Sequence, residues 1–476
     1  MRVLLIVPNM NSHDAMPSLS VAYLNGFINE TSNHVASIAD LSYHKKDWKK
    51  YLLNKIKEEK PDLIGFSVLS FNYPEALMIA RFIKDYFTIK IIFGGVHVIL
   101  APEEVIENNA IDIISIGEGE QVLKELLDKS LNCENIHGIW YKQGGIVIKN
   151  KKRKLISNLD TLAFPDFKDF EIERYFIVNH NHFPIMASRG CPYNCTYCSN
   201  HVLRKNLEGK YVRFRSVDSV IKEIVLRINQ YSNRGLKFFY FFDDTFISNT
   251  KFILEFCKKY KEKGFHTQFK WTANVRANLV TEKIIKAMKD AGCYEVRMGV
   301  ESGNDYIRNT VYKRNMSHQQ LINTFRITKK YYLHLRLDFI IGAPYETLDM
   351  MDESLQLAKQ SKGDRIFFAR LYPFPGTEIK TICEKEQTIQ QNIPFDEKGI
   401  PPVERTNFVT KKQLNKFAKK ISKWQIQRYI NQGLKMRGFL FIWDIFLFLL
   451  YYKHKYGLEF NQIYRWYVEK YTLDRL

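Results

Sequence analysis

The sequence lacks the features that mark secreted and nucleic-acid-binding proteins. Its seven cysteines are odd in number and mostly isolated, so they form no disulfide framework and favour a reducing, cytoplasmic compartment. Residues 1–8 are apolar but short, end at Pro8 and carry no small-residue cleavage site, which predicts a strand rather than a signal peptide. No DNA- or RNA-binding motif accompanies the net charge of +20, so nucleic acid is not an expected partner.

What is present is an ordinary globular composition. The 476 residues are 45% hydrophobic and 26% charged, which is enough for a substantial core and, by length, for about three domains. The positive charge has two interpretations: lysines spread over solvated faces, or attraction to an anionic surface such as a membrane.

Three of the cysteines stand close together, at Cys191, Cys195 and Cys198. Gly190 and Pro192 flank the first of them, so this stretch is expected to be a loop. Three thiolates are one short of the set that holds a tetrahedral zinc ion or a four-thiolate cluster. A [4Fe–4S] cube held by three cysteines would leave one iron with an open coordination position for a substrate or cofactor. The alternatives are inert structural thiols and a structural zinc site whose fourth ligand is a nearby histidine: His180, His182 or His201.

Residues 1–135 alternate strand and helix patterns. Short apolar runs predict strands at 3–7, 35–40, 62–68, 90–95 and 112–117, with helical spacing between them. This alternation predicts an α/β domain with a doubly wound, Rossmann-like parallel sheet, whose ligands lie beyond the carboxyl ends of strands. Three of these ends are polar or rich in glycine, which lets a large flat ligand approach the backbone: Ser67–Asn72, Gly94–His97 and Gly117–Glu120.

A linker, residues 136–184, carries a hairpin pattern around Gly144 and Gly145 and aromatic residues expected to pack between domains. Strand and helix patterns alternate again over 185–385, which predicts a partial (β/α)6 barrel. The chemistry of such barrels gathers at the carboxyl ends of the strands, so the cysteine loop and the other strand ends should face one cavity.

The cysteine loop resembles that of the radical S-adenosylmethionine (SAM) enzymes, with the spacing Cys-x3-Cys-x2-Cys and Tyr197 before the last cysteine. The first domain, with its three strand exits and the segment 17–24, resembles the cobalamin-binding domain that precedes many radical SAM domains. The resemblance implies that SAM chelates the open iron and is cleaved by one electron to a 5′-deoxyadenosyl radical, with flavodoxin or ferredoxin as the reductant.

Family resemblance also implies roles for single residues. Asp243 and Asp244 stand where relatives contact the SAM amino group, and Glu301 and Ser302 resemble the SAM contacts of the fourth strand. Arg276 and Arg336 are candidates for the SAM carboxylate or the substrate, and Gly342 for the segment bordering adenine. The alternative for the charged residues is a salt bridge at the barrel rim.

The cobalamin prediction departs from the mutase pattern, because the sequence has no Asp-x-His-x-x-Gly motif to supply a histidine ligand to cobalt. We therefore expect cobalamin to bind without one, close to four residues of the strand exits: Ser67, Gly94, Gly95 and His97. The alternative for His97 is an ordinary turn or core histidine.

The last part, residues 386–476, has a different composition. A basic helix is expected over 411–435, and the apolar run 438–452 is shorter than the ~20 residues that span a bilayer. This run predicts either a buried helix or an interfacial membrane helix, and the second would put the enzyme at the inner membrane face with a lipid-like substrate.

The sequence thus predicts a cobalamin-dependent radical SAM enzyme, a methyltransferase acting on an unactivated carbon of a small or lipid-like molecule. One alternative is a radical SAM enzyme that closes rings or rearranges its substrate. An alternative of another class is a non-catalytic basic protein with a structural metal that docks on membranes or nucleic acid.

Overall fold

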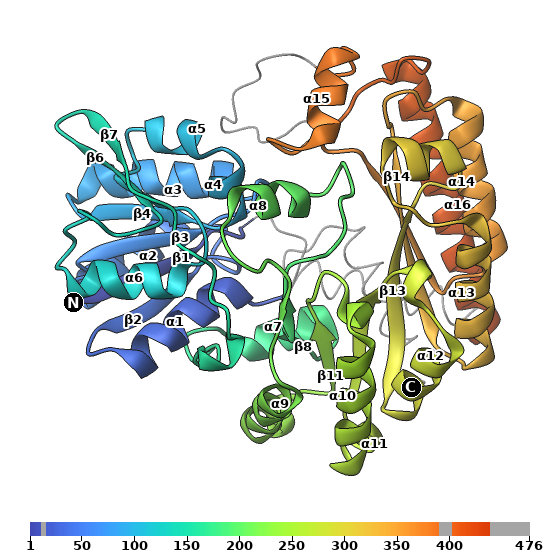
Figure 1. The fold of residues 1–476 in the computed structure, drawn as a ribbon, viewed down its shortest axis with the longest axis horizontal. Helices are drawn as coiled ribbons and strands as arrows, with labels where there is room; N and C mark the ends of the chain where they lie inside the picture. Colours follow the sequence, from blue (N-terminus) through green and yellow to red (C-terminus); the bar gives the residue numbers. More distant parts are fainter. Residues whose placement is uncertain (11–15, 390–401, 438–476) are drawn as a thin grey trace.

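The computed structural model describes residues 1–10, 16–389 and 402–437 and consists of two α/β units side by side (Figure 1). The apolar run 438–452 lies outside the described residues. Among those described, no helix has both the length and the apolar character needed to cross a membrane.

The first unit is a seven-stranded sheet in the order β2-β1-β3-β4-β5-β6-β7. The first five strands are parallel, and β6 and β7 form an antiparallel hairpin added to β5, so the hairpin expected in the linker completes this sheet. The doubly wound topology is confirmed, and the strand order places its switch point between β1 and β3. The strands are β1 Arg2–Val7, β2 Val35–Asp40, β3 Leu63–Ser67, β4 Lys90–Gly94, β5 Ile113–Ser115, β6 Ile139–Gln143 and β7 Ile146–Lys149.

Helices cover both faces of this sheet. Because both faces of β1 are therefore buried, its sequence is a continuous apolar run. Val3 and Leu5 pack on one face, with the cluster that contains residues of α1 and α6, whereas Leu4 and Ile6 pack on the other with α2 and α3. The helices are α1 Leu19–Thr31, α2 Trp48–Glu59, α3 Tyr73–Tyr86, α4 Val96–Leu100, α5 Pro102–Glu107 and α6 Gly119–Asp128.

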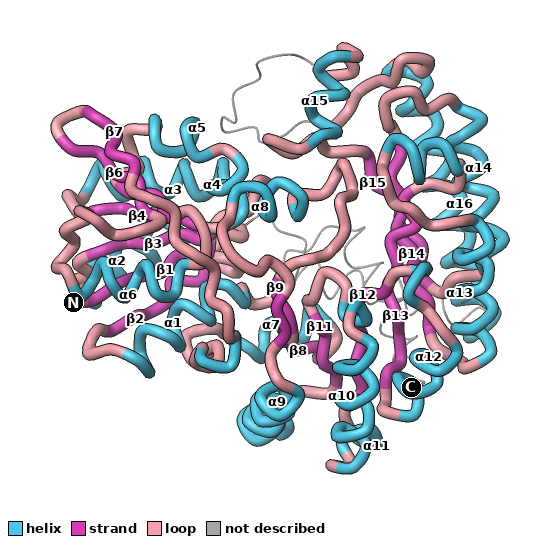
Figure 2. Tube along the Cα trace, viewed as in Figure 1, coloured by secondary structure: helices cyan, strands magenta, loops and turns pink. Residues whose placement is uncertain are grey.

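The second unit is an open sheet of six parallel strands in the order β15-β14-β13-β12-β11-β8, as a partial barrel requires. The helices that follow the strands cover its outer face (Figure 2). The strands are β8 His182–Ile185, β11 Phe238–Phe241, β12 Lys270–Val275, β13 Cys293–Glu301, β14 His334–Ile341 and β15 Arg365–Arg370. The longer helices are α9 Val217–Tyr231, α10 Thr250–Glu262, α12 Glu282–Asp290, α13 His318–Lys330, α14 Leu348–Ser361 and α16 Lys411–Arg437.

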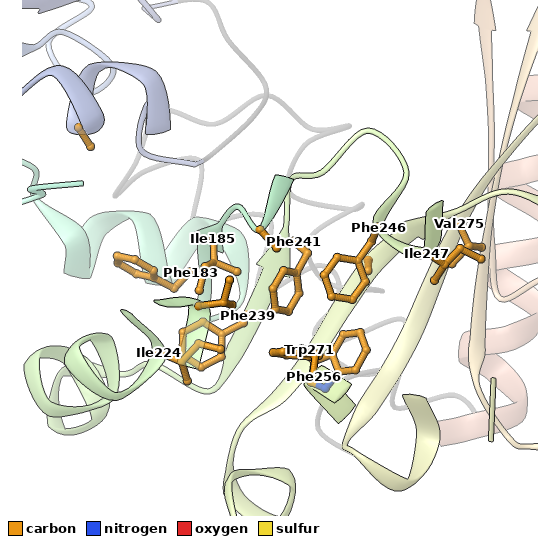
Figure 3. Close-up of a cluster of buried hydrophobic side chains, with 14 of the residues drawn as sticks. Phe183, Ile185, Ile224, Phe239, Phe241, Phe246, Ile247, Phe256, Trp271 and Val275 are labelled. Atoms are coloured by element: carbon orange, nitrogen blue, oxygen red, sulfur yellow. The ribbon is translucent and has the colours of Figure 1, made fainter. Parts of the chain in front are cut away.

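Aromatic side chains fill the space between this sheet and its outer helices (Figure 3). Phe239, Phe241 and Trp271 from β11 and β12 are buried there together with Phe256 of α10. Because side chains alternate along a strand, the residues between them point to the inner face of the sheet. That inner face carries polar side chains such as Thr272, Asn274 and Glu295, and the candidate site lies at its carboxyl edge.

The linker joins the two units through packing and hydrogen bonds. Phe167 and Phe170 belong to the buried cluster shared by both units, as expected for aromatics between domains. Tyr175 of α7 (Ile172–Asn179) donates a hydrogen bond of 2.7 Å to the Asp40 carboxylate at the end of β2. Gly26 of α1 is required where the linker crosses, because a Cβ there would lie 2.2 Å from the Phe164 carbonyl oxygen.

Gly95 offers a direct test of the first sheet's edge. Its backbone φ angle is +96°, a value that glycine adopts readily and other residues rarely do. A Cβ added at this position would lie 2.6 Å from the Val68 amide nitrogen. Gly95→Ala should lower the free energy of unfolding by about 3 kcal/mol through backbone strain and overpacking. Chemical denaturation measures this change. Gly144→Ala is the control, because φ is also positive there but no described atom lies within 4 Å of the added Cβ, so only about 1 kcal/mol should be lost. Equal losses in the two variants would contradict the close approach.

Candidate functional site

The cysteine loop runs from β9 (Ser188–Arg189) to α8 (Asn200–Asn206) at the carboxyl edge of the second sheet. It starts with a tight turn at Gly190, where φ is +86° and a Cβ would lie 2.5 Å from the Tyr211 carbonyl oxygen. Cys195 is buried, Cys191 and Cys198 are half-buried, and all three are free thiols. Among the described residues no three His, Cys, Asp or Glu side chains gather around one point as a single metal ion needs. A cube of several irons does not need that convergence, since each thiolate binds its own iron.

Two buried arginines converge on Cys195. Arg276, from the end of β12, points Nη1 at the Cys195 sulfur from 3.6 Å, and Arg314 does the same from 3.7 Å. Arg276 also stacks on the Tyr193 ring, with its guanidinium carbon 3.7 Å from the centroid. Nε and Nη2 of Arg276 and Nε of Arg314 are buried without a hydrogen-bond partner among the described residues. Unsatisfied cationic donors beside a sulfur fit a bound anionic group, such as a thiolate-held cluster with a carboxylate ligand.

The other two sulfurs have polar neighbours as well. Cys191 lies 3.7 Å from the Thr245 hydroxyl, and Asn200 donates to the Cys198 sulfur over 3.5 Å. Burial raises the pKa of the Cys198 thiol to about 11 and also raises the pKa of Cys191. The thiolate is the form that binds metal, so iron and the nearby donors would have to offset this burial.

Asp243 and Asp244 follow β11 and have different environments. Asp243 is buried and accepts hydrogen bonds from the Ser188 hydroxyl and, at 3.0 Å, from the Ala187 amide. Burial raises its pKa to about 6, although these bonds oppose the shift. Asp243 therefore holds the start of the cysteine loop. Asp244, the next residue, is exposed and lies close to the Asn200 side chain, so it is the more accessible carboxylate of the pair.

Glu301 ends β13 at an irregularity in its pairing with β14 and has a positive φ of +67°. Its carboxylate accepts a hydrogen bond of 2.9 Å from the Tyr197 hydroxyl and lies 3.8 Å from Arg314. Burial raises the pKa of Glu301, while Arg314 opposes that shift. A Cβ at Gly299 would lie 2.1 Å from the Glu301 carboxylate, so a side chain there would displace that carboxylate from its present position. Ser302 is fully buried and pairs with the Ser354 hydroxyl at 3.3 Å, inside the protein rather than at the site edge.

Gly342 follows β14 with φ of +92° and donates its amide to the Glu346 carboxylate over 2.7 Å. Glu346 is fully buried, and burial raises its pKa to about 8. The segment 342–346 is thus a tight turn built on a buried acid.

Arg336 lies farther from the cysteine loop than Arg276 does, within β14. It donates to Asp338 over 3.0 Å and stacks on Phe367, and Arg297 of β13 is its register partner. The structure therefore separates the two arginines that the sequence offered for the same role. Arg276 borders the cysteines, and Arg336 belongs to the inner face of the sheet.

The switch-point edge of the first sheet presents small, polar and apolar residues. Ser67 is hydrogen-bonded to Ser20 at 3.0 Å, and Gly94 and Gly95 are half-buried. Leu69 and Phe71 follow β3 with 53% and 60% of their surfaces exposed. An apolar surface bordered by hydroxyls and glycine backbone fits a broad, flat macrocycle.

His97 has no exposed surface, in keeping with its interpretation as a core histidine. Its Nδ1 lies 3.0 Å from the Ser70 hydroxyl, its ring packs on Tyr73, and burial lowers its pKa to about 4. The side chain is therefore held beneath the edge where Ser67 and the glycines lie.

The switch-point edge of the first sheet faces the carboxyl edge of the second sheet, where the cysteine loop lies. Phe71 contacts Tyr372 and Phe374, which follow β15, edge to face with ring centroids 5.2 and 5.3 Å apart. In addition, Glu118 and Glu120 form ion pairs with Arg189, the residue two before Cys191, at 2.8 and 2.6 Å. A ligand at the first edge would therefore lie opposite the cysteine loop.

Sequence reasoning missed Arg314 and Arg297. Arg314 reaches Cys195 from the loop after a π-helical turn at Ile307–Val311, and Arg297 stands inside a strand. No local pattern distinguishes them from the many other basic residues. The alternation of β13, in which Arg297 falls on the face opposite Val296 and Met298, is the one signal that could have found Arg297.

The comparisons agree with this geometry. The family model described as radical SAM superfamily matches residues 185–358, and the model described as B12 binding domain matches residues 8–127. An uncharacterized methyltransferase of Pyrococcus horikoshii is 31% identical over 88% of this chain and 91% of its own length. An anaerobic magnesium-protoporphyrin IX monomethyl ester cyclase of Cereibacter sphaeroides is 24% identical over 80% of this chain and 63% of its own length. The structure of the radical SAM methyltransferase TsrM from Kitasatospora setae superposes with a TM-score of 0.69 and 15% identity, over 82% of this chain and 76% of that one.

Proposed function

Because this chain belongs to the radical SAM superfamily and carries a B12-binding domain ahead of its radical SAM domain, we propose that it is a methyltransferase acting on an unactivated carbon. The 31% identity with a methyltransferase along nearly the full length of both chains supports methyl transfer. The edge of the B12-binding domain lies opposite the cysteine loop of the radical SAM domain. This arrangement supports a reaction in which both cofactors act on one substrate.

The residues present fit the cofactors that this family uses. Cys191, Cys195 and Cys198 would hold a [4Fe–4S] cluster, and Asp244 is the more accessible carboxylate for the ammonium of SAM. The exposed edge at Leu69 and Phe71 would hold cobalamin in the first domain. When bound, the cluster supplies one electron for SAM cleavage and cobalamin supplies a transferable methyl group.

The chain's own residues bind, orient and enclose these groups. Asp243 fixes the start of the cysteine loop through Ser188 and Ala187. Arg276 and Arg314 bring positive charge next to the Cys195 sulfur, and so next to the anionic cluster that it would hold. The contact of Phe71 with Tyr372 and Phe374 covers one side of the space between the domains, and excluding water there protects a radical from side reactions.

The observation that carries the proposal is the pair of buried arginines with unsatisfied nitrogens beside Cys195, opposite the B12-binding edge. The test is anaerobic reconstitution with iron, sulfide and cobalamin. We expect about four irons per chain, cobalamin retained through gel filtration, and SAM cleavage on reduction. Zinc with a fourth protein ligand in place of iron, or SAM left intact by the reduced protein, would contradict the assignment.

A second candidate is ring formation or rearrangement, favoured by the 24% identity with a cyclase. Mass spectrometry of metabolites from cells with and without the gene separates the two, because methylation adds one CH2 unit. The use of a one-electron donor such as flavodoxin or ferredoxin stays a prediction. Peripheral association with a membrane also stays a prediction.

A further inference from the structure

The last helix of the described chain, α16, carries a row of lysines that the proposed reaction does not use. Its sequence is rich in lysine and contains no aspartate or glutamate. Four of its lysines are spaced four, three and four residues apart, which is the repeat of a single helix face, and they form what we call the lysine stripe: Lys412, Lys416, Lys419 and Lys423. At about 100° and 1.5 Å per residue, the stripe covers an arc of roughly 60° and a length of about 16 Å.

The lysine stripe faces away from the rest of the protein. The opposite side of α16, half a turn away, is buried against β14 and α14 through three apolar side chains: Leu414, Phe417 and Ile421. All four lysines of the stripe are exposed. The helix itself lies beside α14 on the side of the second unit that is turned away from the first unit (Figure 1). A partner bound to the stripe would therefore leave the space between the two units uncovered.

The charge of the lysine stripe is not neutralised within the described residues. Two other lysines of α16, Lys411 and Lys420, form ion pairs with Glu404 and Asp352, both at 2.6 Å. No lysine of the stripe forms an ion pair with another described residue. The helix thus has two lysines that bind acidic residues of the fold and four that present their charge to the surroundings. Like charges one helical turn apart repel one another, and an anionic surface against the stripe would relieve that repulsion.

We propose that the lysine stripe docks this protein on a membrane surface that carries anionic lipids. Ammonium groups along one helix face match a layer of lipid phosphates, and each lysine strengthens such binding roughly fivefold. Apolar groups adjoin the charge, since Ile426 is 50% exposed three residues beyond Lys423 and the sequence after α16 leads into the apolar run 438–452. Nucleic acid matches the stripe less well, because lysines alone supply neither the arginine forks that read bases nor the rings that stack on them. This inference goes beyond the proposed reaction and does not depend on it.

The test is co-sedimentation of the anaerobically reconstituted full-length protein with lipid vesicles. One set of vesicles is phosphatidylcholine alone, and the other is phosphatidylcholine and phosphatidylglycerol in equal parts. The wild type should bind the anionic vesicles in preference to the neutral ones, and less tightly at high salt because salt screens the charges. Replacing two lysines of the stripe together, Lys416→Gln with Lys419→Gln, should weaken binding to the anionic vesicles about 25-fold.

Lys222→Gln with Lys261→Gln is the matched control, since these exposed lysines of α9 and α10 remove the same charge from another part of the surface. This variant should bind as the wild type does. All four substituted side chains are exposed, so both variants should keep the thermal unfolding of the wild type. Equal binding by the stripe variant and the wild type, or an equal loss in the control, would overturn the inference. Binding of the wild type to neutral vesicles as tightly as to anionic ones, or to single-stranded RNA but not to anionic vesicles, would overturn it as well.

Discussion

Replacing Cys195 by alanine should abolish SAM cleavage and lower the iron content far below four per chain. Cys195 is the most buried of the three loop cysteines and the one that both Arg276 and Arg314 approach. Without its thiolate the cube would keep two protein ligands, while two guanidinium groups would face an alanine methyl group. The measurements are iron and sulfide analysis, the absorbance shoulder near ~400 nm, and 5′-deoxyadenosine formed after reduction.

Cys257→Ala is the matched control for this substitution. Cys257 is also buried, but it lies on α10 in the aromatic core, where it is an ordinary apolar side chain. This variant should keep its irons and its SAM cleavage, with only a modest loss of stability. An unchanged iron content in Cys195→Ala, or an equal loss in Cys257→Ala, would show that the loop does not hold the cluster.

The sequence predicted both sheets because their signals are local. Continuous apolar strands such as 3–7 separated by helical spacing are typical of parallel sheets covered on both faces, and the Cys-x3-Cys-x2-Cys spacing lies within one loop. The partial barrel and its six strands are confirmed on the same grounds.

The partners of the site residues depend on contacts between distant segments, so the sequence could not assign them. It offered Asp243 and Asp244 as equals, and only the fold shows that Ser188 and Ala187 occupy the first. Likewise, Arg314 reaches Cys195 across 119 positions of the chain. Periodicity gives the face on which a residue lies, but it does not give the residue that it meets there.

Glu118 is another residue whose partners the sequence could not predict, and replacing it should cause a large loss of stability. Its loop, Gly117–Glu120, has the composition of a ligand-binding strand exit, yet its carboxylate is directed at the second unit. It accepts hydrogen bonds from Arg189 and Arg213, both at 2.8 Å, and from the Ile156 amide at 2.7 Å. Only 13% of its side chain is exposed, and only 4% of that of Arg213. Glu118 therefore ties the first unit to the strand that leads into Cys191.

Glu118→Ala should lower the free energy of unfolding by about 3–5 kcal/mol, the cost of leaving buried charges without their partner. Arg213 would lose its carboxylate inside the protein, while Arg189 would keep only Glu120. Denaturant unfolding under anaerobic conditions measures the change. Glu134→Ala, at an exposed glutamate in the same unit, should change stability by less than about 0.5 kcal/mol.

The pH dependence of this ion-pair network gives an independent check. Desolvation raises the pKa of Glu118, but the hydrogen bonds and charges of Arg213 and Arg189 outweigh it, so the pKa lies below its ordinary value. A carboxyl with a depressed native pKa stabilises the fold above its unfolded pKa of about 4.3, and this contribution is lost as the pH falls through the native value. The stability difference between the wild type and Glu118→Gln should therefore be constant near neutral pH and shrink below about pH 4.3. A difference that stays constant into acid, or that is already absent at pH 7, would show that the charge of Glu118 does not hold the two units together.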